Sequence, residues 1–281
     1  MKSPLQTSTV VGVCQGDFLW KFILMNSIEL GIVGASGTMG SALVQRCETV
    51  GLSARGITRD TVSYEEDVVN AEILLLCMKQ RDTIEWLDHH GQGLRDGQII
   101  LSLAALLSVD VLRRHCNNDQ IRIGRFMTTT GIADSAQEIV WTSDGFFDQD
   151  QLQKVDSLLS QLGETKYLGV AQDEALERRT FRACVVGWIA DSCSVHVDGL
   201  MEVLGFTSKE AHEAVDNALS VLARQRAYGL DYGECRDQVM SKGGITEAGV
   251  KARSEQVYNG IEMGLLAAVS QAETISALYS K

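Results

Sequence analysis

Short apolar runs alternate with stretches of helical periodicity over the first part of the chain. Runs that predict β-strands cover residues 28–33, 71–78, 99–103, 121–127, 138–141 and 166–170, and a further strand is expected to end near Thr58. The run at 71–78 is apolar almost throughout, which is typical of a parallel strand buried on both faces. Helical spacing at 41–50 and 151–162 is followed by Gly51 and Gly163, which can end a helix. This alternation predicts an α/β fold with a Rossmann-type, doubly wound parallel sheet.

The strand pattern stops after about residue 171, and helical patterns follow. Helices are expected at 173–204, from a capping box at Thr207 and Glu210 to about residue 228, at 233–240 and at 246–281. We therefore predict a dinucleotide-binding domain over 25–170 and an all-helical domain over 171–281. The helical domain has larger apolar faces than one copy can bury, so a homo-oligomer of at least two copies is expected.

Composition narrows the class of protein. The chain has 281 residues, of which 45% are apolar and 22% charged, the proportions of a soluble globular protein. Its net charge of -12 argues against nucleic-acid binding, and no apolar run is long enough for a membrane span. The seven cysteines lack metal-ligand spacing, so we expect reduced thiols in the cytoplasm, with neither a disulfide framework nor a metal site. Residues 1–24 are interpreted as an extension, disordered or preceding the native start, because Asp17 and Lys21 interrupt the apolar run that a targeting signal would need.

A glycine-rich turn follows the first predicted strand and leads into a helix. Glycines at such a turn let the backbone approach a pyrophosphate, and the helix N-terminus supplies free N–H groups. A purely structural turn is the alternative, but the position between strand and helix favours a dinucleotide. The residues expected to contact the cofactor here are Gly34, Ser36, Gly37, Thr38, Met39 and Gly40.

The end of the second strand indicates which dinucleotide binds. An NAD site usually has an acidic residue there, which reaches the ribose 2′-hydroxyl. This chain has Thr58 and Arg59 instead, which suit a 2′-phosphate, so NADP is the favoured cofactor. Asp60 follows directly and leaves two alternatives open, a cap for the next turn or the ribose-binding acid of an NAD site.

Three segments resemble the pyrroline-5-carboxylate reductase family. They are the turn at 37–40, the Cys-Met-Lys-Gln at 77–80, which resembles Val-Lys-Pro in the family, and Ser-Lys-Gly-Gly-Ile-Thr at 241–246, which resembles the signature Ser-Pro-Gly-Gly-Thr-Thr. The likeness runs from residue 28 to about residue 278. It implies that the helical domain dimerises and binds substrate, that Met78 and Lys79 lie at the cofactor, and that the enzyme reduces a cyclic imine acid to proline or a related product, with the active site between the domains.

Reduction of an imine acid also needs groups that bind the substrate carboxylate and hold the imine in place. Within the signature segment, the hydroxyls of Ser241 and Thr246 and the N–H groups of Gly243 and Gly244 are expected to bind it at the start of the last helix. The alternative is a helix cap with two flexible glycines. Lys242 is interpreted as an exposed side chain, although it could strengthen this binding.

The segments expected at the substrate depart from the family most. Residues 127–131 and 180–189 lack the family's glycine and proline pattern, Trp188 replaces a small residue, and the chain's one proline is Pro4. Arg178, Arg179 and Arg182 could bind a more acidic substrate, or they could form a solvated helix face. His89 and His90 are expected to face solvent. We predict an NADP-dependent oxidoreductase acting on C=N bonds, and the alternative is a binding or regulatory protein that keeps the dinucleotide and has lost turnover.

Overall fold

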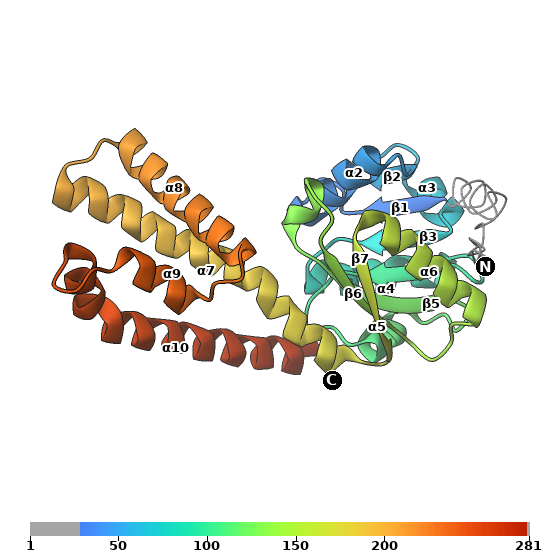
Figure 1. Cartoon of the computed structure of the whole chain (residues 1–281). Helices are drawn as coiled ribbons and strands as arrows, with labels where there is room; N and C mark the ends of the chain where they lie inside the picture. Colours follow the sequence, from blue (N-terminus) through green and yellow to red (C-terminus); the bar gives the residue numbers. More distant parts are fainter. Residues whose placement is uncertain (1–28, 280–281) are drawn as a thin grey trace, which may run out of the picture. The chain divides into compact units, whose positions relative to one another are not determined.

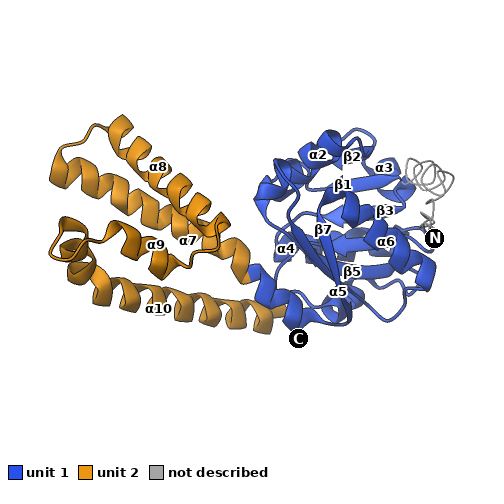
Figure 2. Cartoon of the chain, viewed as in Figure 1, with its two compact units in different colours: residues 1–180 blue, residues 181–281 orange. Residues whose placement is uncertain are grey.

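The computed structural model describes residues 29–279, so the predicted extension over 1–24 and the first residues of the predicted cofactor domain lie outside the described part. The chain divides into two compact units, residues 1–180 and 181–281 (Figure 2). The domain boundary predicted at residue 171 lies where the last strand gives way to a long helix. The two units separate later, within that helix.

The first unit is built on a seven-stranded sheet in the order β2-β1-β3-β4-β5-β6-β7 (Figure 1). The strands are β1 Leu30–Val33, β2 Ala54–Ile57, β3 Ile73–Leu76, β4 Ile99–Ser102, β5 Arg122–Met127, β6 Glu138–Ser143 and β7 Glu164–Val170. All neighbours run parallel except β5 and β6, which are antiparallel. The predicted doubly wound parallel sheet is confirmed, and the pair β5–β6 is its one antiparallel step. Only the short 3₁₀ helix η2 (Thr130–Ala133) links β5 to β6, and a parallel crossover needs a longer connection.

Helices cover the sheet because its strands are apolar on both faces. Within β1, β3 and β4 nearly every side chain is buried, including Leu75 and Leu101 in the main core cluster. Helix α2 packs against α6, and α4 packs against α5. The helices of this unit are α2 Thr38–Val50, α3 Tyr64–Asn70, α4 Gln80–His90, η1 Gly91–Gly93, α5 Val109–Cys116 and α6 Gln149–Leu162. Helix α2 begins three residues earlier than its apolar spacing predicts, directly after the glycine turn, and ends at Gly51 in the left-handed conformation, as expected.

Four helices continue the chain: α7 Asp173–Leu204, α8 Ser208–Ala227, α9 Tyr232–Val239 and α10 Ile245–Tyr279. The capping box at the start of α8 is confirmed, since the Thr207 and Glu210 side chains each accept a hydrogen bond from the other's N–H. Helix α10 exposes large apolar side chains, among them Met263 and Leu266, which are 71% and 64% exposed. This unit therefore presents apolar surface that a partner could cover. Within residues 29–279, no helix is both long and apolar enough to cross a membrane.

Candidate active site

A cleft of about 1020 Å³ opens at the carboxyl ends of β1, β2 and β3. Its lining includes seven of the residues predicted to contact a cofactor: Gly34, Ser36, Gly37, Thr58, Arg59, Met78 and Lys79. They come from three loops that are distant in sequence. In the sheet order, β2 and β3 lie on opposite sides of β1, so the cleft opens where the chain changes direction across the sheet. Open α/β sheets bind ligands at such a point.

The glycine turn has a backbone geometry that leaves no room for side chains at key positions. Gly34 has φ +81°, and its N–H donates to the carbonyl oxygen of Ile57 at 3.0 Å. A Cβ atom on Gly40 would lie 2.2 Å from the carbonyl oxygen of Gly34. This close approach brings the first turn of α2 against the strand end, as in dinucleotide sites.

Helix α2 starts at Thr38, so Thr38, Met39 and Gly40 form its first turn. Its N-cap is Gly37, no side chain caps it, and no acidic residue lies in its first turn. The first N–H groups of a helix have no partner within the helix. They and the helix dipole can therefore receive a phosphate.

Opposite charges meet at the end of β2. Arg59 is 91% exposed, and its guanidinium lies 3.8 Å from the carboxylate of Asp82 at the start of α4. A pair this long and this exposed contributes little, so Arg59 can exchange it for a phosphate. Asp60 lines the same cleft, so the structure brings both the predicted phosphate ligand and the alternative ribose ligand to this place.

Aromatic side chains that the sequence did not indicate form one wall of the cleft. The indole N–H of Trp86 donates to the Tyr64 hydroxyl at 2.6 Å, and the His90 ring lies 5.0 Å from that of Trp86. The expectation that His90 faces solvent is wrong, because these rings cover it and leave its side chain 15% exposed. Burial lowers the pKa of His90, which favours the neutral imidazole. The wall suits a flat heteroaromatic ring.

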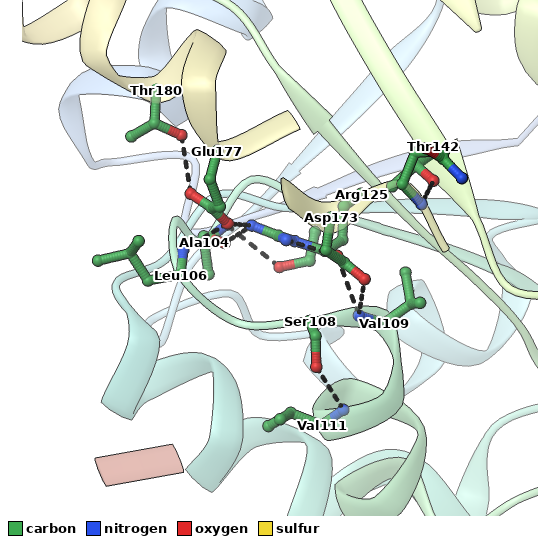
Figure 3. A network of polar contacts seen from close by, with 12 residues as sticks. Ala104, Leu106, Ser108, Val109, Val111, Arg125, Thr142, Asp173, Glu177 and Thr180 are labelled. Carbon is green, nitrogen blue, oxygen red and sulfur yellow. Dashed lines mark hydrogen bonds and ion pairs between the residues drawn. The ribbon is translucent and has the colours of Figure 1, made fainter. Parts of the chain in front are cut away.

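A buried arginine joins β5 to the first turns of α7 (Figure 3). The Arg125 side chain is fully buried, and its guanidinium forms ion pairs with Asp173 at 2.6 Å and with Glu177. It also donates to the carbonyl oxygen of Ala104 in the loop after β4, at 3.0 Å. Buried arginine is stable in a protein when it is paired and hydrogen-bonded in this way.

The same carboxylates hold the loop after β4. Glu177 accepts the N–H of Leu106 at 2.8 Å, and Asp173 accepts the N–H of Val109 at 3.2 Å (Figure 3). Leu106 has φ +63°, a conformation that a leucine adopts only when its surroundings impose it. Glu177 also accepts the hydroxyl of Thr180 at 3.0 Å. The network therefore fixes a loop at the carboxyl edge of the sheet, and sequence reasoning missed it.

The signature segment is already hydrogen-bonded to itself. Gly243, with φ +74°, donates its N–H to a carboxylate oxygen of Glu247 at 2.5 Å, and Gly244 donates to the carbonyl oxygen of Ser241 at 2.9 Å. Glu247 is also paired with Lys251 at 2.8 Å. Thr246 lies in the first turn of α10, and the side chains of Ser241, Lys242 and Thr246 are exposed. The predicted residues therefore lie together at the start of α10. Glu247, which the sequence analysis did not single out, lies beside them.

Arg178 and Arg179 of α7 have carboxylate partners as well. Arg178 is paired with Glu174 at 2.8 Å, both side chains being largely exposed, and Arg179 is paired with Glu138 at 3.2 Å. The Arg178 pair fits the alternative of a solvated helix face. Arg179 instead pairs with a residue of β6 and is only 23% exposed, so its charge is already used within the first unit.

Cys77 also lines the cleft, and burial raises its pKa to about 12, so it stays a thiol. Among residues 29–279, no three His, Cys, Asp or Glu side chains converge as a metal site would require.

Two comparisons show which proteins this chain resembles. The model described as pyrroline-5-carboxylate reductase dimerisation matches residues 180–275. The pyrroline-5-carboxylate reductase of Aquifex aeolicus (strain VF5) is 26% identical over 271 residues, which cover 87% of this chain and 96% of that protein. The chain is therefore similar to a pyrroline-5-carboxylate reductase over most of its length, and residues 180–275 match that family's dimerisation domain. The resemblance drawn from three short segments is thereby confirmed.

Solved structures share the fold of this chain. The Plasmodium falciparum pyrroline carboxylate reductase, solved with NADP bound, has a TM-score of 0.73 at 17% identity, covering 91% of this chain and all of that one. An imine reductase from Aspergillus terreus, in complex with NADPH4 and dibenz[c,e]azepine, has a TM-score of 0.51 at 16% identity, covering 90% of this chain and 93% of that one. The match over 180–275 gives the helical unit a dimerisation domain, which supports the predicted homo-oligomer.

Proposed function

We propose that the chain is an NADPH-dependent oxidoreductase that reduces the C=N bond of a cyclic imine. The observation that carries the proposal is the cleft at the carboxyl ends of β1 to β3, closed by a glycine turn with no room for a side chain at Gly40. The pyrroline-5-carboxylate reductase of Aquifex aeolicus and the NADP-bound relative support it.

The residues of the cleft fit such a cofactor. The first turn of α2 would hold the pyrophosphate, and Thr58 and Arg59 would hold a 2′-phosphate. When bound, the nicotinamide supplies the hydride for the reaction. The aromatic wall of Tyr64, Trp86 and His90 would cover the adenine ring without adding a charge to the cleft.

The helical unit would contribute to the substrate site through Ser241, Gly243, Gly244 and Thr246. From the family resemblance, the first substrate to test is pyrroline-5-carboxylate, whose reduction gives proline. The alternative, a dinucleotide-binding protein without turnover, is favoured by the altered residues at 127–131 and 180–189. Retention of the signature segment at 241–246 favours the enzyme.

The test is NADPH oxidation, followed by absorbance, with five- and six-membered cyclic imines that do or do not have a ring carboxylate. NADPH binding is measured in parallel by fluorescence titration. The proposal predicts turnover of at least one imine. Tight NADPH binding with no turnover of any imine would favour the binding protein instead.

A further inference from the structure

Acidic side chains outnumber lysine and arginine in the lining of the cofactor cleft. Four carboxylates face two such cations there: Asp60, Glu65, Asp82 and Glu85 against Arg59 and Lys79. All six belong to the first unit and line the same cavity of about 1020 Å³. A cofactor that carries an additional phosphate therefore enters a cleft whose own charges oppose it, and the placement of each carboxylate decides how strongly.

Asp82 is the carboxylate of this lining that meets the predicted phosphate ligand. Its oxygen lies 3.8 Å from the guanidinium of Arg59. Asp82 belongs to the first turn of α4, which follows β3, whereas Arg59 follows β2. Since β2 and β3 lie on opposite sides of β1, the pair joins the two sides of the cleft.

Two other carboxylates of the lining are paired elsewhere. Glu85 accepts a hydrogen bond from Arg81 at 2.7 Å, one turn earlier on α4. Glu65 lies 3.5 Å from the His90 ring in the aromatic wall. The contact with Arg59 therefore distinguishes Asp82 from its acidic neighbours, and its side chain is 44% exposed, against 91% for Arg59.

A carboxylate in this place acts on a 2′-phosphate in two ways. The phosphate takes the guanidinium donors of Arg59 in a charge-assisted contact, and Asp82 competes for the same donors before the cofactor arrives. Once the phosphate is bound, both anions lie beside one cation and repel each other. NADH carries a neutral 2′-hydroxyl at this position, so neither effect applies to it.

We propose that Asp82 is a specificity-determining residue that weakens the preference for NADPH over NADH by holding Arg59. The inference rests on the proposed function, since it assumes that Arg59 receives the 2′-phosphate. It deepens that function by assigning opposite roles to two residues in contact: Arg59 favours NADPH, and Asp82 limits the discrimination, so that NADH remains an accepted cofactor. A unfavourable charge built into a site is a recognised way to set specificity.

The experiment titrates the full chain with NADPH and with NADH and follows nicotinamide fluorescence. Asp82→Asn keeps the size of the side chain and removes its charge. The Kd for NADPH should fall by about two- to tenfold, the range for an exposed ion pair together with repulsion of the phosphate, whereas the Kd for NADH should stay within about twofold. A gain in affinity is a result that damage to the fold could not produce.

Asp110→Asn is the matched control. Asp110 is an exposed carboxylate in the first turn of α5, and it is not part of the cleft lining. The substitution makes the same change in net charge and in the charge at a helix start, so it should leave both affinities unchanged. An equal gain for NADPH in Asp110→Asn would reduce the effect of Asp82 to net charge and would overturn the inference.

The contact itself is tested by combining Asp82→Asn with Arg59→Ala. Without the guanidinium, the gain in NADPH affinity should be smaller than in the wild-type background, and an equal gain would show that Asp82 does not act through Arg59. Unchanged NADPH affinity in Asp82→Asn, or equal gains for NADPH and NADH, would also overturn the inference. Because the titrations need no imine, the predicted shifts without turnover would refute the proposed function alone, and turnover without the shifts would refute the inference alone.

Discussion

Replacing Arg125 by methionine tests whether the buried ion network holds the first unit together. Methionine fills much of the same space but leaves Asp173 and Glu177 without their cation. Removing one partner of a buried pair costs about 3–5 kcal/mol. The Arg125 side chain is fully buried, but those of Asp173 and Glu177 are 20% and 19% exposed, so water can partly solvate them. We therefore expect the lower end, a loss of about 3 kcal/mol in the free energy of unfolding.

Urea denaturation at fixed protein concentration measures this loss. With a slope of about 2 kcal/mol per M, the midpoint should fall by about 1.5 M. Arg178→Met, which breaks the exposed pair with Glu174 on the same helix, is the control and should cost less than about 1 kcal/mol. Adding Asp173→Asn and Glu177→Gln to the methionine variant should recover part of the loss, because the carboxylates are then no longer unpaired charges. If Arg125→Met were no more destabilising than Arg178→Met, the network would not stabilise the fold.

Three further predictions concern the cofactor cleft and the helical unit. Arg59→Ala should weaken NADPH binding about ten- to a hundredfold in a fluorescence titration and leave NADH binding nearly unchanged; equal losses would contradict a contact with the 2′-phosphate. Gly40→Ala should abolish NADPH binding, because its Cβ would meet the Gly34 carbonyl oxygen at 2.2 Å, and unchanged affinity would show that the turn can open. Light scattering at micromolar concentration should find at least a dimer, and Leu266→Asp on the exposed apolar face of α10 should shift it toward the monomer; a monomeric wild type would refute this.

The sequence predicted best those features that depend on neighbouring residues. The apolar run at 71–78 correctly predicted β3, and the helical pattern at 173–204 correctly predicted both ends of α7. The capping pair Thr207 and Glu210 correctly predicted the start of α8. The glycine turn and Arg59 reach one cleft because loops that follow parallel strands meet at one edge of the sheet.

Features that depend on distant residues could not be predicted. Arg125 interrupts an apolar strand, which is a signal that it is paired, but its partners Asp173 and Glu177 lie 48 and 52 residues further on. The burial of His90 depends on Tyr64 from another helix. The antiparallel pairing of β6 depends on a connection too short for a crossover, and no local pattern of that strand records its direction. Glu247 is close to the signature segment in sequence, but its contact with Gly243 follows from the left-handed turn.

The central claim is that the chain transfers hydride from NADPH to an imine carbon. The most direct measurement uses NADPH with deuterium at one or the other C4 position, incubated separately with 1-pyrroline and with pyrroline-5-carboxylate. With one of the two labelled forms, mass spectrometry and NMR should find a single deuterium at the former imine carbon of the amine product. Amine without deuterium from either form, or no amine although NADPH binds, would contradict the claim.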